Sequence, residues 1–349
     1  MSTALPDAAR GLAPAAAGSS HLTAGLPADP PAGSATDHRP PAAQPARSRR
    51  HWLALPLVLP WALGLGACSP QHFALRRLAD GLAADEGAPD DEDDLQLVRD
   101  AAPAWLKTSE AVLARTPDHL PLATSVAAGF TRYAWAFVAF EADRIEPRDV
   151  RAATALRERA ARLYHRAQRH ALKALTLHDA QLLADLRRST AGAGGGSLRR
   201  DRLPDAQVAC AYWGAAAWGA RIALTKQDPD VVADLPLAVE LARRAWRTQP
   251  AFGGGDLAVL MGQFEAARPG GQAAQAERHF AEALRIGGGR HPGALLAIAE
   301  ALALPAGDRP RFDAALQAVL ADTDGRPGLT ARALRERALW LRERADDLF

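Results

Sequence analysis

Apolar residues recur with helical spacing along most of the chain after position 100. They lie three and four positions apart, in segments dominated by Ala, Leu, Arg and Glu. Runs that alternate Val, Ile or Thr with polar residues, which predict β-strands, are nearly absent. Thr-Pro-Asp, Asp-Pro-Asp and glycine clusters separate the helical segments. The pattern therefore predicts an all-α domain over residues 101–349.

A spacing typical of tetratricopeptide (TPR) repeats recurs in this region. The second helix of a TPR carries Ala, an aromatic residue and Ala at fixed spacing, followed by Pro. Residues 238–250 contain this spacing with Ala in the aromatic position, and residues 276–283 contain it with Phe280. Residues 160–167 fit the spacing as well, and residues 312–319 give a weaker copy. Because small residues at a helix crossing allow close packing, we expect a TPR-like array of antiparallel helix pairs. A helical bundle without regular repeats is the alternative.

Two segments, residues 129–144 and 209–220, are apolar on nearly every side. A helix that is apolar all round must be buried all round, so both segments fit the core of the array. Alternatively, their aromatic side chains line a cavity for an apolar or amphipathic ligand, which Glu141 or Arg132 would orient. The candidate ligand-binding residues are Tyr133, Phe137, Glu141, Tyr212, Trp213 and Trp218.

The N-terminal part has a different pattern. Residues 1–46 are rich in Ala, Pro, Gly and Ser and have too few large apolar side chains to fold, so we expect a disordered extension. Residues 47–67 combine three arginines, an apolar run and a small-residue ending, which is the layout of an export signal. The run is shorter than the ~20 apolar residues of a membrane-spanning helix and contains two prolines. Leu-Gly-Ala-Cys at its end resembles the bacterial lipobox, so we expect cleavage before Cys68 and lipidation of its thiol.

An acidic run at positions 90–94 separates the expected anchor from the helical domain. A Ca²⁺ loop would need oxygen ligands at alternating positions and a glycine at the bend, and this run has neither. We therefore expect residues 68–100 to be a lipidated, solvated acidic tether.

Charge and cysteine content exclude several classes of protein. The chain has 42 Lys and Arg against 40 Asp and Glu, and the part after residue 67 holds 37 of each sign. Such a balance, without a basic stripe, argues against nucleic-acid binding. The two cysteines are Cys68 and Cys210. With Cys68 lipidated no disulfide is possible within the chain, and Cys210 is expected to be a small buried hydrophobic residue.

Sequence signals of catalysis are missing. The chain has no G-x-x-x-x-G-K-[ST] phosphate loop, H-E-x-x-H zinc helix or G-x-S-x-G nucleophile elbow. His165 and His170 are five positions apart, which does not place them on one helix face as metal ligands. Asp256 follows three glycines and is expected to be a helix N-cap. We therefore expect no enzyme, no metal and no cofactor other than the lipid on Cys68.

Several segments, in order, resemble the T-component family of tripartite ATP-independent periplasmic (TRAP) transporters. They read AWAFVAFEADRIE, LRERAARLYHRAQRHALKAL, AYWGAAAWGARIAL, RRAWRTQPAFGGG and ALWLRERADDLF. The resemblance implies a periplasmic lipoprotein of TPR-like helices that forms a homotrimer and docks the solute-binding protein of a TRAP transporter. It also suggests a route for an apolar or organic-acid ligand. The Gly/Ser insertion at 192–197 and the long N-terminal extension depart from the family pattern.

These observations lead to one expected function and two competitors. The expected protein is an accessory component of a TRAP system, anchored by lipid to the outer rather than the inner membrane. A general TPR-like envelope scaffold, which would hold a protein or peptide partner on its concave surface, is the first competitor. The second is an extracytoplasmic carrier of a hydrophobic molecule without a transporter partner.

Overall fold

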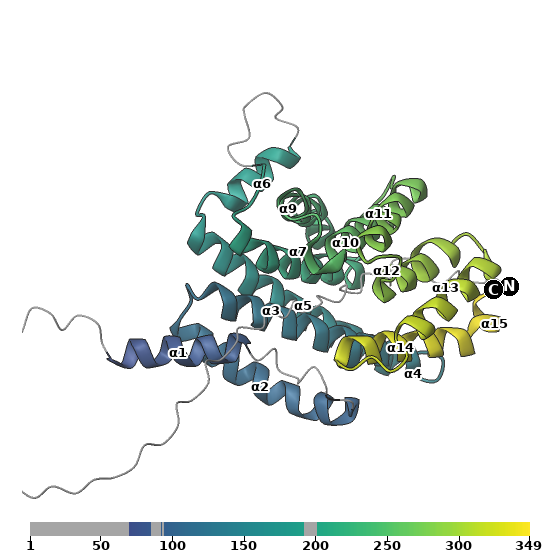
Figure 1. Ribbon diagram of the computed structural model, residues 1–349, viewed down its shortest axis with the longest axis horizontal. Helices are drawn as coiled ribbons and strands as arrows, with labels where there is room; N and C mark the ends of the chain where they lie inside the picture. Colours follow the sequence, from purple (N-terminus) through teal and green to yellow (C-terminus); the bar gives the residue numbers. More distant parts are fainter. Residues whose placement is uncertain (1–69, 85–91, 93, 192–200) are drawn as a thin grey trace, which may run out of the picture. The chain divides into compact units, whose positions relative to one another are not determined.

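Every regular element in the described part of the chain is a helix. The computed structural model describes residues 70–84, 92, 94–191 and 201–349, and these ranges contain no β-strand. The predicted all-α fold is therefore confirmed (Figure 1). Residues 74–349 belong to one compact unit. Cys68, the expected signal and the insertion at 192–197 lie outside the described residues.

The helices follow one another with short connections. The first half contains α1 (Pro70–Ala84), α2 (Leu95–Arg115), α3 (Leu120–Tyr133), η2 (Ala134–Ala139), α4 (Phe140–Ile145), α5 (Val150–His178), α6 (Leu182–Thr190), η3 (Asp205–Gln207) and α7 (Val208–Leu224). The second half contains α8 (Pro229–Val232), α9 (Leu235–Thr248), η4 (Phe252–Gly254), α10 (Asp256–Ala267), α11 (Ala273–Ile286), α12 (Pro292–Ala297), η5 (Ile298–Ala303), α13 (Arg309–Asp322), α14 (Leu329–Glu343) and α15 (Ala345–Leu348). Two helices, α1 and α2, begin inside the stretch that the sequence suggested as a tether.

Side chains that accept hydrogen bonds from backbone N–H groups mark several helix starts. Asp94 Oδ1 accepts from the first turn of α2, and Asp149 Oδ1 accepts from the first turn of α5. Two other helices are capped by histidine. His119 Nδ1 accepts from the Leu122 N–H at 3.1 Å, and His291 Nδ1 accepts from the Ala294 N–H at 3.1 Å. Because Nδ1 accepts, the ring proton of each neutral histidine lies on Nε2.

Both histidine-capped helices run into a π-helical segment. α3 continues through η2 into α4, and α12 continues into η5. A π-helical turn accommodates an extra residue and rotates all later side chains about the helix axis, and such turns are frequent at functional sites. The apolar segment at 129–144 therefore does not keep a single α-helical face along its length.

The core is built around α7, which packs against α3, α5 and α9 (Figure 1). Nearly all of its residues are buried, as expected for a helix that is apolar all round. Gly214 permits a close approach to α5, because a Cβ at this position would lie 2.9 Å from the Cβ of Ala171. The segment at 209–220 is therefore a central helix whose small residues allow tight packing.

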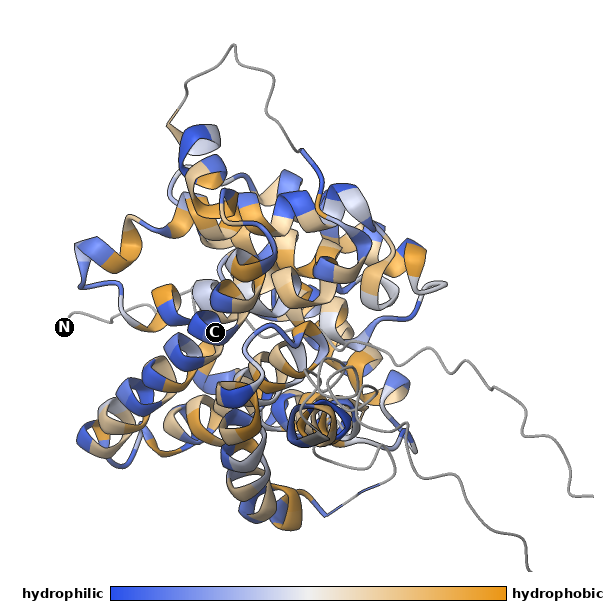
Figure 2. Ribbon diagram, turned by 90° about the vertical axis from the view of Figure 1, so that its left-hand side faces the viewer, coloured by the Kyte–Doolittle hydropathy of each residue, from blue (hydrophilic) through white to orange (hydrophobic). Residues whose placement is uncertain are grey.

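The later helices pack in chain order. α10 contacts α11, α11 contacts α12, α12 contacts α13, and α13 contacts α14. Phe280 of α11, which occupies the predicted aromatic position, is fully buried against α10 at Gly262. Figure 2 shows hydrophobic residues gathered along some faces of the helices and hydrophilic residues along others. None of the helices that the structure describes has both the length and the apolar character required to span a bilayer.

Candidate functional site

The predicted aromatic residues lie on α7 and on the continuous helix formed by α3 and η2. Tyr212, Trp213 and Trp218 project from α7 and are at most 3% exposed. Tyr133 ends α3 and is buried, whereas Phe137 in η2 is half-buried. The rings of Tyr133 and Phe137 are 5.4 Å apart between centroids, and those of Tyr212 and Trp213 are 4.9 Å apart. The first pair lies along the continuous helix of α3 and η2, and the second pair lies within α7.

Arg132 connects the two elements. Its guanidinium carbon lies 4.8 Å from the centre of the Trp213 ring, within the range of a cation–π interaction. Trp218 faces elsewhere, since its Nε1 donates to Asp234 Oδ2 at 3.2 Å, just before α9. Glu141 is half-buried on α4 and forms no hydrogen bond or ion pair with the described residues. Of the two charged residues expected to orient a ligand, Arg132 is the one with a contact to a predicted aromatic ring.

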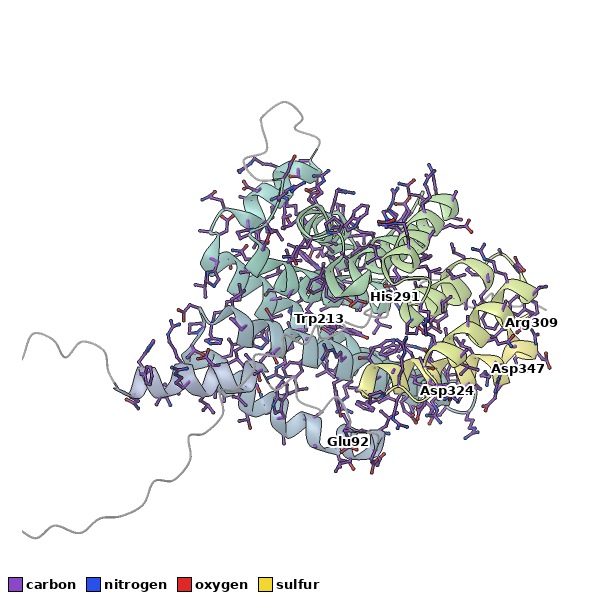
Figure 3. The ribbon with its side chains drawn as sticks, viewed as in Figure 1. Glu92, Trp213, His291, Arg309, Asp324 and Asp347 are labelled. Carbon is purple, nitrogen blue, oxygen red and sulfur yellow. The ribbon has the colours of Figure 1, made fainter. Side chains whose placement is uncertain are left out.

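A buried acid and a histidine complete this region, and neither was expected from the sequence to have this role. Asp256 is fully buried, and its Oδ1 lies 3.2 Å from Nε2 of His291. His291 precedes α12 and is labelled with Trp213 in Figure 3. The positive charge of Arg132 favours the ionised form of the Asp256 carboxyl group. The sequence signal that could have suggested this pair is the combination of three glycines before Asp256 and a histidine before Pro292.

The prediction that Asp256 caps α10 is wrong. Gly255 occupies the N-cap position, and Asp256 is the first residue inside the helix. Gly255 has φ of 120°, and a Cβ there would lie 2.9 Å from the carbonyl oxygen of Ala283, so the site requires glycine. The tight backbone turns the Asp256 side chain inward instead of toward the N–H groups of its own helix.

Burial controls the chemistry of Asp256. Loss of solvation raises its pKa to about 6, although His291 and Arg132 both favour the ionised form. A carboxyl group with this pKa changes its protonation state near neutral pH. Of the three groups gathered here, the Trp213 ring and the titratable Asp256 carboxyl are buried, and Arg132 is partly exposed.

A second buried polar cluster joins distant helices. Arg337 of α14 contacts Asp143 of α4 and Glu300 of η5, both at 2.7 Å. Arg157 of α5 donates to Asp143 at 3.1 Å and to Glu146 at 2.7 Å. Burial raises the pKa of Glu300, and Arg337 opposes this effect. Arg157 belongs to a basic stretch of α5 with helical spacing, but its side chain is largely buried and paired with two carboxylates rather than solvated.

Metal and thiol chemistry find little support in the described residues. No group of three or more His, Cys, Asp or Glu side chains there could hold a metal ion. Cys210 is fully buried, with Sγ 3.6 Å from the carbonyl oxygen of Ala171. Burial raises the pKa of its thiol to about 12, so the nucleophilic thiolate is not populated at neutral pH.

Comparison with known proteins agrees with the resemblance noted in the sequence. The sequence model of the family described as "TRAP transporter T-component" matches residues 91–349. An uncharacterized protein of Treponema pallidum (strain Nichols) is 29% identical over 267 residues, which cover 74% of this chain and 81% of that protein. The family match spans well over half of the chain and includes both polar clusters described above. The chain belongs to the TRAP transporter T-component family.

Proposed function

We propose that the protein is a lipid-anchored periplasmic accessory component of a TRAP-type transport system, and that it docks the solute-binding protein of that system. Family membership over residues 91–349 carries this proposal. The family consists of transport components rather than enzymes. The buried, high-pKa thiol of Cys210 agrees with a role in binding rather than in nucleophilic catalysis.

The anchor is the lipid on Cys68, at the outer rather than the inner membrane. The lipobox-like ending of the signal supports this part of the proposal. α1 begins at Pro70, so only Ser69 separates the expected lipid from the first helix. The body would therefore stay close to the membrane surface.

A TPR-like array would supply the docking surface, in a homotrimer. The order of packing from α10 to α14, each helix on the next, supports an array in which neighbouring helix pairs share a core. The position of Phe280 over Gly262 supports the same arrangement, because a large residue fills the gap left by a small one.

A ligand, apolar or an organic acid, would bind beside Trp213. The support is the contact of Arg132 with the Trp213 ring and the proximity of Asp256. A carboxylate of the ligand would pair with Arg132, and its apolar part would lie against the aromatic rings. Tyr133 and Phe137 would extend this apolar surface along η2.

Docking is tested by binding a purified TRAP solute-binding protein to the immobilised protein. A solute-binding protein of an ATP-dependent transporter from the same organism serves as the control. We expect binding of the TRAP protein and no binding of the control, because docking requires a specific complementary surface. Equal binding of both, or of neither, would contradict docking and favour a general envelope scaffold.

A further inference from the structure

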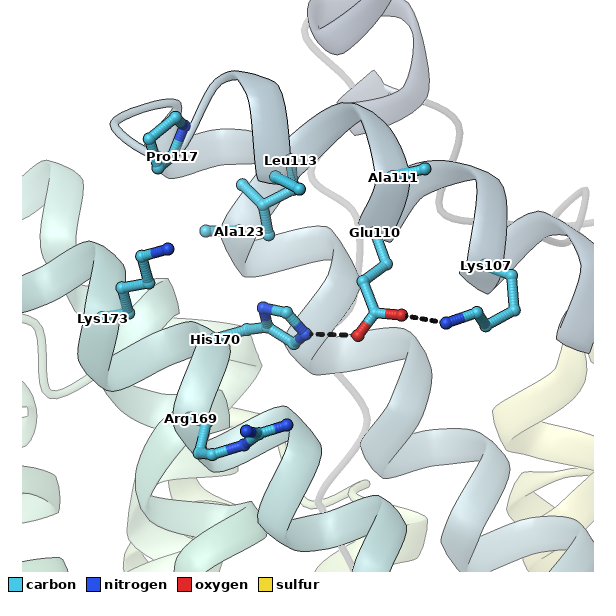
Figure 4. A pocket seen from close by; sticks show the side chains of 10 residues that line it. Lys107, Glu110, Ala111, Leu113, Pro117, Ala123, Arg169, His170 and Lys173 are labelled. Atoms are coloured by element: carbon cyan, nitrogen blue, oxygen red, sulfur yellow. Dashed lines mark hydrogen bonds and ion pairs between the residues drawn. The ribbon is translucent and has the colours of Figure 1, made fainter.

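A pocket of about 660 Å³ lies where α2 meets α5 and the start of α3 (Figure 4). None of the aromatic residues proposed above lines it. Leu113 and Ala123 are buried at its floor, and Pro117 lies at its edge. The full lining consists of Lys107, Glu110, Ala111, Leu113, Ala114, Pro117, Ala123, Arg169, His170 and Lys173. Its volume is that of a site for a small molecule.

The one acid in the lining is already paired. Glu110 accepts hydrogen bonds from Arg166 at 2.8 Å and from His170 at 2.8 Å, and it also pairs with Lys107. Burial works against ionisation, but these hydrogen bonds lower the pKa of Glu110 to about 2. Phe130 supports the arrangement, since its ring stacks with His170 and lies 5.3 Å from the guanidinium carbon of Arg166. Glu110 is therefore ionised, with its charge compensated.

Two cations of the lining remain without a partner among the described residues. Arg169 and Lys173 are exposed and lie one turn apart on α5, and neither side chain forms a hydrogen bond or ion pair with the described residues. Burial lowers the pKa of His170, so its ring is neutral at pH 7. The charge of Lys107 cancels that of Glu110. The lining is therefore left with a formal excess of two positive charges, from Arg169 and Lys173. This excess would attract an anion.

We propose that this pocket binds a small amphipathic anion, with one carboxylate or phosphate group between Arg169 and Lys173. The short apolar body of the ligand would lie on Leu113 and Ala123. Arg and Lys both donate hydrogen bonds to such oxygens, and the compensated Glu110 does not repel them. The proposal is independent of docking to a solute-binding protein, and either can fail without the other.

The test is isothermal titration of the purified protein with hexanoate and with hexyl phosphate. Hexan-1-ol, which lacks the charge, and acetate, which lacks the apolar body, are the control ligands. We expect hexanoate and hexyl phosphate to bind measurably more tightly than either control ligand. The binding should weaken as salt is added, because the two cations are exposed. A preference for one anion identifies the acidic group that the pocket takes.

Two double variants of α5 have the same change in charge. R169Q/K173Q removes the unpaired cations of the pocket, and we expect it to lower the affinity by about tenfold or more. R159Q/R162Q removes two exposed cations of the same helix outside the pocket and should change the affinity by less than about twofold. Equal losses in both variants, hexanol binding as well as hexanoate, or no binding of either anion would each overturn the proposal.

Discussion

Arg337 donates from Nη1 to Oδ2 of Asp143 at 2.7 Å, although 194 positions separate the two residues. The Arg337 side chain is 7% exposed and that of Asp143 is 10% exposed. The guanidinium also donates from Nε to Glu300 at 2.8 Å. Buried charges are tolerated only when they are paired and hydrogen-bonded. This contact therefore fixes α14, near the end of the chain, to α4, the helix that continues the first π-helical segment.

Replacing Arg337 should destabilise the protein strongly. Arg337→Gln leaves Glu300 buried without its cation and removes one of the two arginines that pair with Asp143 in the cluster. We expect a loss of about 3–5 kcal/mol in the free energy of unfolding, measured by urea denaturation. Arg342→Gln, an exposed neighbour on α14, is the control and should change it by about 0.5 kcal/mol or less. Similar values for the two variants would show that the cluster adds no stability.

The buried carboxyl of Asp256 should give stability a distinct pH dependence. Its pKa rises from 3.8 to about 6 on folding. Between these values the folded state holds a proton that the unfolded state releases, so stability falls as the pH rises, by roughly 1 kcal/mol per pH unit. Above about pH 6 this contribution levels off. Asp256→Asn removes the titration and keeps a side chain of the same shape beside His291.

The measurement is urea unfolding of the natural protein and of Asp256→Asn from pH 4 to 7. Groups distant from Asp256 titrate in the same way in both proteins, so the difference between the two curves reports Asp256 and its immediate surroundings. We expect the variant to gain stability relative to the natural protein up to about pH 6 and to keep that gain at pH 7. Parallel curves would contradict the raised pKa.

Two helical glycines should respond to alanine in opposite directions. At Gly262 a Cβ would lie 2.4 Å from the Phe280 ring, so Gly262→Ala should lower stability by about 1–3 kcal/mol. At Gly81 in α1 no atom lies within 4 Å of the new Cβ, so Gly81→Ala should raise stability by about 0.5–1 kcal/mol. Differential scanning calorimetry measures both, and a change of the same sign in both would refute the packing argument.

Phe137→Ala separates the two interpretations of the aromatic residues. Phe137 is half-buried, so its truncation should cost less than the ~3–5 kcal/mol of a fully buried phenylalanine. If it contacts a ligand, native mass spectrometry should show loss of a co-purified small molecule. Phe312 of α13 is buried in the core that α13 shares with α14. Phe312→Ala is therefore the control that destabilises the fold but should keep the ligand. Retention of the ligand by both variants would leave Phe137 as a packing residue.

The lipid anchor is tested with the two cysteines of the chain. Cys68→Ser removes the thiol that would be acylated, so the protein should move from the membrane fraction to the soluble fraction. Cys210→Ser is the control, because Cys210 is buried in the core and should not affect attachment. Membrane attachment that survives Cys68→Ser would rule out this residue as the anchor.

The spacing of apolar residues along the sequence predicted the all-α fold, and it also predicted which helix would be buried on all sides. The segment at 209–220 has no polar face, and it is the central helix α7. The predicted position of Phe280 in a gap between helices follows from its spacing to small residues. These features could be read from the sequence because each depends on residues within a few turns of one another.

The polar interior could not be predicted in the same way. Asp256 and His291 are 35 positions apart, and Arg337 and Asp143 are much further apart, so no local pattern pairs them. The π-helical turns at η2 and η5 rotate the side chains that follow them about the helix axis. Neither turn contains a proline or glycine that would have indicated it in the sequence. The contact of Arg132 with Trp213 likewise depends on how α3 crosses α7.

The contact between α4 and α14 also bears on the order in which the protein can fold. In a simple repeat array each unit contacts only its neighbours, so folding can begin anywhere and spread. Here Asp143 is synthesised long before Arg337, and its buried pairing is completed only when α14 has emerged. We therefore expect the helical body to unfold in one cooperative transition, and a chain that ends before α14 to leave the region around η2 incompletely packed.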